Sequence, residues 1–258
     1  MCGRMTLTRS GSEIALFFAE AMALAGGAGS GPREVCEEDE QSLRPRFNLA
    51  PSQDVLTLLP GAIGTRDAVS FAWKRWGLVP SWAKDPTIGA RMFNARVETA
   101  DSKPSFRAAW KRRRCLVVAD GFYEWSPKNR DHRPFHFRPS RGNLLGFAGL
   151  FETWGGEEGE TIESCTVLTT EANADLVGVH HRMPVILDPE RFAKWLDPEA
   201  DPDALKALML PAPAKTLRRR AVTRYVNDPR RDDARCLELE SKAEQRDLFA
   251  PVGEEEEF

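Results

Sequence analysis

Short apolar segments of strand length, separated by turn residues and short helical segments, are the feature that most constrains the fold of this chain. Residues 53–59 and 69–77 alternate in the manner of strands, and the continuous apolar run 115–119 predicts a buried strand. Further strands are expected at 122–125, 135–138, 144–153, 164–169, 183–187 and 216–226. Helical segments are expected at 13–24 with Ser12 as the cap, 102–112, 171–177, 189–196 and 203–210. Strands with interspersed short helices predict an α+β fold, a single domain built on a mostly antiparallel, barrel-like β-sheet with short flanking helices.

The domain organisation predicted from the sequence is simple, because the chain has no internal repeat and no convincing boundary. Residues 1–240 are expected to form one domain. Within it, residues 26–44 combine a small-residue stretch with an acidic run and are interpreted as a loop insertion. Residues 241–258, which include Glu254–Glu257, are interpreted as an acidic, disordered tail.

Composition argues against several kinds of protein. No apolar run approaches the ~20 residues that a membrane helix needs, and no basic segment precedes the apolar stretch 14–25, so neither a membrane span nor a signal peptide is expected. A cytoplasmic protein is therefore predicted. The 5 cysteines form no CxxC pair and the 4 histidines match no standard ligand spacing, so we expect no disulfide framework and no metal site.

The N-terminus carries the clearest chemical signal. Cys2 follows Met1, and its small side chain favours removal of that methionine. A mature N-terminal cysteine has an α-amine with a pKa of about 7.7–8.0 next to a thiol with a pKa of about 8.5. The amine can attack an aldehyde to give a Schiff base, which the thiol closes to a five-membered thiazolidine. The N-terminus is therefore predicted to capture an electrophile such as a carbonyl compound.

Six short motifs, in order along the chain, support this interpretation. They are CGR at 2–4, RFNLAP at 46–51, WGLVPSW at 76–82, FNARVET at 93–99, ADGFYEW at 119–125 and HHRMP at 180–184. Together they closely resemble the SRAP (SOS response-associated peptidase) family, over residues 1 to about 226. The resemblance implies a DNA-damage protein that senses abasic sites in single-stranded DNA and crosslinks to the ring-opened sugar as a thiazolidine, which shields the lesion. It implies no cofactor, and association with the nucleoid when bound to DNA. We expect a monomer, because a protein that engages a single DNA strand needs no symmetry.

The resemblance also assigns roles to matching residues. Cys2 is the nucleophile, and Asn94 positions the N-terminus or the sugar. Glu124 is a general acid–base group for Schiff-base formation, and His180 handles protons at the sugar oxygen during ring opening. The candidate DNA-binding residues hold phosphates or stack on bases: Arg4, Arg96, Arg182, Thr169, Phe47, Trp82 and Trp125.

Several of these residues have structural alternatives. Glu124 lies between aromatic residues and would also suit a buried, salt-bridged acid, and Asn94 would also suit a turn cap. Arg96 and Glu98 would also suit a surface ion pair. His181 would point away from His180 on a strand, so only one of the two can face the site.

Two other functions use the same residues. In a cysteine-type peptidase, which is the activity in the family's name, the Cys2 thiol attacks an acyl carbon with His180 as base and needs no α-amine. In a non-covalent single-stranded DNA-binding module, arginines and aromatic residues suffice and Cys2 is dispensable. Lyase activity also stays open, because a Schiff base permits β-elimination at the abasic site.

Overall fold

The computed structural model describes residues 2–25, 43–61, 69–127, 132–156 and 159–240. Most of the predicted insertion 26–44 and all of the predicted tail 241–258 lie outside these residues.

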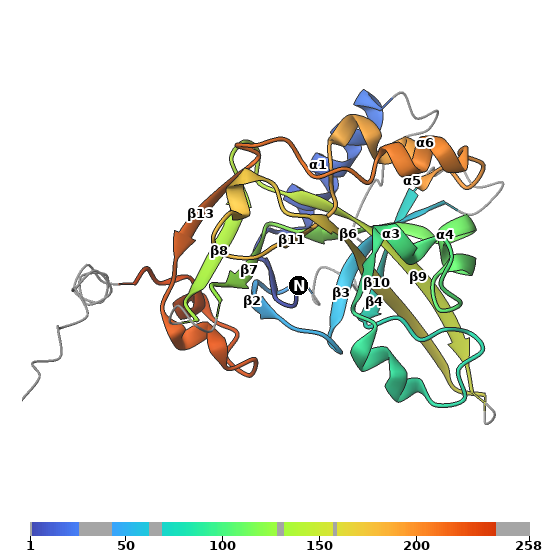
Figure 1. Cartoon of the computed structure of the whole chain (residues 1–258), viewed down its shortest axis with the longest axis horizontal. Helices are drawn as coiled ribbons and strands as arrows, with labels where there is room; N and C mark the ends of the chain where they lie inside the picture. Colours follow the sequence, from blue (N-terminus) through green and yellow to red (C-terminus); the bar gives the residue numbers. More distant parts are fainter. Residues whose placement is uncertain (1, 26–42, 62–68, 128–131, 157–158, 241–258) are drawn as a thin grey trace, which may run out of the picture.

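A closed barrel of five strands forms the centre of the molecule (Figure 1). Around the barrel, β10 pairs with β4, β4 with β3, β3 with β6, β6 with β9, and β9 with β10 again. Only the β10–β4 pairing in this ring is parallel. The barrel strands are β3 (Asp54–Pro60), β4 (Val69–Trp76), β6 (Arg114–Ala119), β9 (Leu145–Gly155) and β10 (Thr161–Glu171). The short strands β5 (Asn94–Arg96), β11 (Arg182–Pro184) and β12 (Ile186–Leu187) extend this sheet.

A second sheet of five strands lies beside the barrel, in the order β13-β8-β7-β1-β2. Its members are β1 (Met5–Leu7), β2 (Arg46–Leu49), β7 (Gly121–Trp125), β8 (Pro134–Pro139) and β13 (Leu217–Ala221). All of its pairings are antiparallel. The prediction of an α+β domain on a mostly antiparallel, barrel-like sheet is therefore confirmed.

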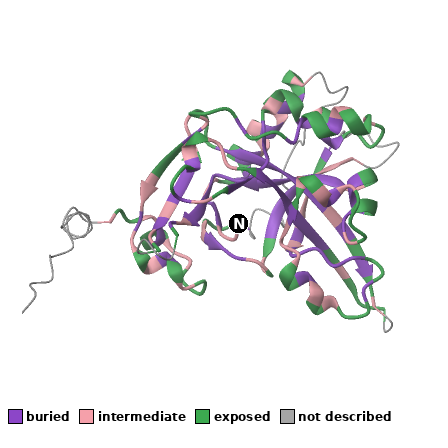
Figure 2. Ribbon diagram, in the orientation of Figure 1, coloured by how far each residue is buried: buried purple, intermediate pink, exposed green. Residues whose placement is uncertain are grey.

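The core lies inside the barrel and between the two sheets, as the purple strands of Figure 2 show. All six residues of β6 are buried, as the apolar run predicts. Helix α1 (Gly11–Leu24) packs on the core through Ile14 and Phe18, and the Phe18 ring stacks on Phe192 with centroids 5.5 Å apart. Burying each such side chain stabilises the fold by about 1.5–3 kcal/mol.

The other helical segments in the described ranges are short. They are α3 (Val97–Ala100), α4 (Arg107–Arg112), α5 (Phe192–Leu196), α6 (Pro202–Ala207), and the 3-10 turns η1 (Pro86–Arg91), η3 (Ala174–Leu176), η4 (Pro189–Arg191), η5 (Arg224–Asn227) and η6 (Ala234–Leu237). None of the helices in the described part of the chain is long and apolar enough to cross a membrane.

Several predicted boundaries were wrong. Ser10, not Ser12, caps α1, because Ser10 and Glu13 exchange hydrogen bonds in a capping box. The predicted strand 183–187 is two strands, because β11 pairs with β10 whereas β12 pairs with β9. The predicted strand 216–226 ends at Ala221, and the predicted helices 102–112 and 171–177 reduce to α4 and to the single turn η3.

The strand order brings the N-terminus to the ends of three strands. Strand β1 pairs with β7 so that Met5 lies opposite Phe122, and the Tyr123 amide donates to the Arg4 carbonyl at 2.9 Å. Strand β5 runs parallel to β10 and places Asn94 opposite Val167.

Candidate functional site

Cys2, Asn94 and Glu124 are held together at the point where β1, β5 and β7 meet. The Asn94 side-chain amide donates to the Cys2 carbonyl, with Nδ2 2.6 Å from the oxygen. Glu124 lies on β7, which flanks the N-terminal segment, and its charge acts on the Cys2 thiol. Three residues that are far apart in the sequence therefore form one cluster.

Burial controls the protonation of this cluster. Cys2 is fully buried and Glu124 is 3% exposed. Burial raises the pKa of the Glu124 carboxyl from 4.5 to about 7, because the charged form loses its hydration. Burial, and to a smaller extent the Glu124 charge, raise the pKa of the Cys2 thiol. Glu124 can thus accept and return a proton near neutral pH, whereas the Cys2 thiol keeps its proton until a base removes it.

His180 lies in the connection between η3 and β11 and is held by a neighbouring backbone. Its Nδ1 atom is 3.0 Å from the Arg182 amide nitrogen and 3.1 Å from the Arg182 carbonyl oxygen. Its ring stacks on His181 with centroids 4.5 Å apart. Burial lowers the pKa of His180 from 6.5 to about 4, so the ring is neutral at pH 7. His181 is the more exposed of the two histidines.

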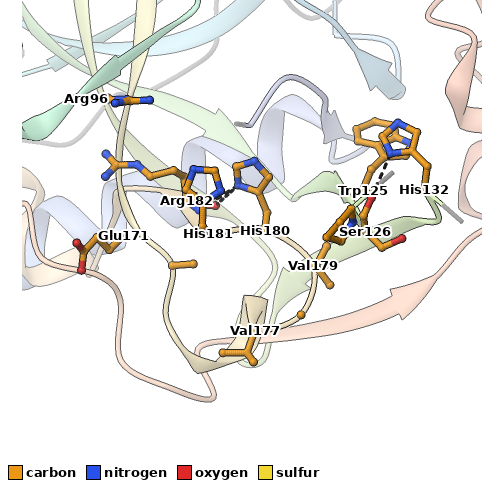
Figure 3. Close-up of a pocket in the computed structure, with 13 residues that line it drawn as sticks. Arg96, Trp125, Ser126, His132, Glu171, Val177, Val179, His180, His181 and Arg182 are labelled. Atoms are coloured by element: carbon orange, nitrogen blue, oxygen red, sulfur yellow. Dashed lines mark hydrogen bonds between the residues drawn. The ribbon is translucent and has the colours of Figure 1, made fainter. Parts of the chain in front are cut away.

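A cavity of about 1100 Å³ opens beside this cluster (Figure 3). One wall is the segment from Glu171 to Arg182, which includes both histidines, and the opposite wall carries Trp125 and His132. The prediction that only one of the two histidines can face the site was therefore wrong, because both lie in the connection before β11 and do not alternate as strand residues do. Arg96 of β5 projects toward the same space.

Cys2, Asn94 and Glu124 do not line the cavity themselves. Trp125 directly follows Glu124, and Arg96 lies two residues after Asn94, so the cluster adjoins the cavity wall.

The three predicted phosphate-binding arginines differ in their surroundings. Arg96 is exposed at the cavity. Arg4 donates to the Asn48 side chain at 2.7 Å and to the Val226 carbonyl at 2.8 Å. Arg182 is 7% exposed and forms a two-pronged ion pair with Glu98, with Nη2–Oε2 at 3.0 Å. Glu98 therefore pairs with Arg182, and Arg96 is the predicted arginine whose side chain is most open to solvent.

The other predicted DNA-binding residues are dispersed. Trp125 lines the cavity, and its indole donates to Asn227 at 2.8 Å. Phe47 is partly buried against the Tyr123 cluster, outside the cavity lining. Trp82 is 58% exposed but also lies outside the cavity lining. Thr169 is fully buried, with its hydroxyl 3.4 Å from the Ala95 carbonyl.

Two titratable residues of the cavity wall, His132 and Glu171, were not considered in the predictions from the sequence. His132 faces the Trp125 ring at 6.4 Å and has a positive φ of 51°, a backbone conformation that is uncommon outside glycine and often occurs at functional sites. Glu171 ends β10 at the same cavity. Neither residue belongs to a motif, so only their spatial neighbours identify them. No cluster of three or more metal-ligating side chains occurs within the described ranges of the chain.

The chain matches a known protein family and is similar to proteins of bacteria and vertebrates. The model of the SOS response associated peptidase (SRAP) family matches residues 1–229. The abasic site processing protein YoqW of Bacillus subtilis (strain 168) is 37% identical over 242 residues, which cover 92% of this chain and 99% of that protein. The abasic site processing protein HMCES of Gallus gallus is 35% identical over 226 residues, which cover 77% of this chain and 67% of that protein.

Solved structures share the fold. A crystal structure of a Bacteroides thetaiotaomicron protein superposes with a TM-score of 0.75 at 21% identity, and the alignment covers 93% of this chain and 100% of that one. A Bordetella bronchiseptica protein superposes with a TM-score of 0.65 at 26% identity, and the alignment covers 86% of this chain and 100% of that one.

Proposed function

Because this chain belongs to the SOS response-associated peptidase family, we propose that it processes abasic sites in single-stranded DNA by capturing the ring-opened sugar through Cys2. The names of its relatives support abasic-site processing. The single observation that supports capture is the contact of Asn94 with Cys2 beside the buried carboxyl of Glu124. This arrangement fixes a nucleophile next to a group that titrates near neutral pH.

In the proposed reaction, removal of Met1 turns the Cys2 nitrogen into a primary amine. His180 exchanges protons with the sugar oxygen as the ring opens, which exposes the C1′ aldehyde. The amine adds to C1′, and the carbinolamine loses water to form an imine. Glu124 donates the proton to the departing oxygen, and its carboxylate form then accepts the thiol proton. The Cys2 sulfur adds to the imine carbon and the nitrogen takes up a proton, so the net loss is one water.

The DNA path is part of the same proposal. Arg96 contacts a phosphate at the cavity, and Trp125 stacks on a neighbouring base. Arg4 and Arg182 would have to exchange protein partners for phosphates. The buried Thr169 hydroxyl and the remote Trp82 are expected to contribute least to binding.

The test mixes the full-length protein with a single-stranded oligonucleotide that carries one abasic site. We expect a denaturant-stable product whose mass equals the protein without Met1 plus the oligonucleotide minus one water. Cys2→Ala and Cys2→Ser should not form this stable product, whereas Cys236→Ser, which changes a buried thiol in another cluster, should. Stable crosslinking by Cys2→Ala, or by protein that retains Met1, would refute the proposed chemistry.

The same variants address the lyase and peptidase alternatives. Cys2→Ala keeps the amine but not the thiol, so its imine cannot close and should permit β-elimination. We expect strand cleavage by Cys2→Ala to exceed that by wild type. If wild type with a blocked α-amine instead hydrolyses peptides and forms no crosslink, the peptidase hypothesis replaces this one.

A further inference from the structure

Three arginines lie together on one face of the second sheet, away from the residues that contact Cys2. In the β8–β13 pair, Arg218 lies opposite Arg138 and Arg220 lies opposite His136. Directly opposite residues of an antiparallel pair share a face, and so do alternate residues of one strand. Arg138, Arg218 and Arg220 therefore form one cationic patch, which we call the arginine ladder.

No acid that the structure describes pairs with the arginine ladder. Among the described residues, no hydrogen bond or ion pair engages the three guanidinium groups, and Arg220 Nε is buried without a partner. Burial and the Arg138 charge lower the pKa of Arg220, which reflects this repulsion. The nearby carboxylate of Asp120 is occupied by hydrogen bonds from Thr6 and Thr8. Like charges that face each other across strands are unfavourable, so the arginine ladder favours an anionic occupant.

The last described residues of the chain lie beside β13, before the acidic residues Glu254–Glu257 of the sequence. Strand β13 is the outer edge of its sheet (Figure 1). Leu239 forms an antiparallel bridge to Val222, the Thr223 amide donates to the Glu238 carbonyl at 3.0 Å, and the Glu240 amide lies 3.5 Å from the Ala221 carbonyl. Glu240, the last residue that the structure describes, therefore lies beside the end of β13.

The length and the charge of the chain after Glu240 would both allow Glu254–Glu257 to reach the arginine ladder. Glu254 follows Glu240 by 14 residues, and a polypeptide of that length can span at most about 46–50 Å. Arg218 lies three residues before Ala221, which is about 10 Å along a strand. Four consecutive carboxylates thus begin within reach of three guanidinium groups.

We propose that Glu254–Glu257 dock on the arginine ladder, so that the chain's own acidic segment occupies this anion-binding face. The contact is intramolecular, weakens with salt, and shields a cationic surface that would otherwise attract other polyanions. It requires neither Cys2 nor an abasic site, so it stands or falls separately from the capture reaction.

The test follows the Nε–Hε NMR signals of Arg138, Arg218 and Arg220 in the full-length protein. In one variant, Glu254–Glu257 are all replaced by Gln. In the matched control, the acidic run Glu37, Glu38, Asp39 and Glu40 becomes Gln, Gln, Asn and Gln, which removes the same charge from another part of the chain. We expect the three signals to shift by more than a linewidth in the first variant only, and the difference to vanish at 0.5 M salt.

Four outcomes would overturn the proposal. Signals that do not change in the Glu254–Glu257 variant would exclude docking, and equal shifts in the control would indicate a general charge effect. Shifts that grow with protein concentration would assign the contact to a second copy of the chain. Signals that move only on addition of undamaged single-stranded DNA would make the arginine ladder a nucleic-acid surface instead.

Discussion

Replacing Glu124 by Gln should stabilise the protein at alkaline pH while it impairs capture. The carboxyl is 3% exposed, and burial raises its pKa from 4.5 to about 7. Below pH 4.5 it is neutral in both the folded and the unfolded state. Between pH 4.5 and 7 only the folded state keeps the proton, so the free energy of unfolding falls as pH rises through this window.

The difference in pKa corresponds to about 3 kcal/mol of stability, which wild type has lost above pH 7. Glu124→Gln removes the ionisation and should therefore be about 3 kcal/mol more stable than wild type at pH 8, and close to wild type at pH 4.5. The abasic-site crosslinking rate at pH 7 should fall by about 10²-fold or more, because the proton donor and acceptor is lost.

Urea denaturation of both proteins from pH 4.5 to 8 provides the measurement. Glu190→Gln, which neutralises an exposed carboxylate, serves as the control and should leave the pH profile unchanged. A stability difference between Glu124→Gln and wild type that does not vary with pH would refute the reasoning, and so would a less stable variant at pH 8.

Three further predictions concern the second sheet and the barrel. Burial lowers the pKa of His136 from 6.5 to about 3, so only the unfolded state gains a proton as pH drops through this range. The free energy of unfolding should therefore fall by about 4 kcal/mol from pH 6.5 to 3. His136→Gln should remove this pH dependence from the urea-denaturation profile. Gly121→Ala should lower the free energy of unfolding by about 2–3 kcal/mol, because its Cβ would lie 2.3 Å from His136 Nε2. Gly155→Ala, whose Cβ meets no atom within 4 Å, should lower it far less, and thermal unfolding of both variants provides the measurement. Arg114→Met should lower the urea midpoint by an amount equivalent to about 2–4 kcal/mol, because its buried guanidinium donates to four backbone carbonyls, and an unchanged midpoint would contradict this role.

Local sequence patterns were sufficient for most strands of the fold. The apolar run at 115–119 became the buried strand β6 after its first residue, Arg114, because a strand with both faces covered favours consecutive apolar side chains. The predicted segments 53–59 and 69–77 correspond to β3 and β4 within a residue at each end. The errors lie where a partner decides the boundary, as at Val185, which separates strands that pair with different neighbours.

Some features of the candidate site could be predicted from sequence motifs, and others depend on the tertiary structure. The motifs predicted Cys2, Asn94, Glu124 and His180 as candidates, because each stands in an unusual short sequence pattern. The same patterns could not distinguish the exposed Arg96 from Arg182, which Glu98 already holds. They also could not reveal His132, whose contact with Trp125 arises from the pairing of β7 with β8.

By itself, then, the sequence determined the residue types available for chemistry, the family, and the strand-rich α+β class, because these depend on local composition and spacing. Only the tertiary structure decided the protonation of Glu124 and His180, since both pKa values change through burial by residues distant in the sequence. It also decided which arginines are free of acidic partners. Burial and cross-strand pairing are properties of the closed barrel and its neighbouring sheet, and no short segment of the chain contains them.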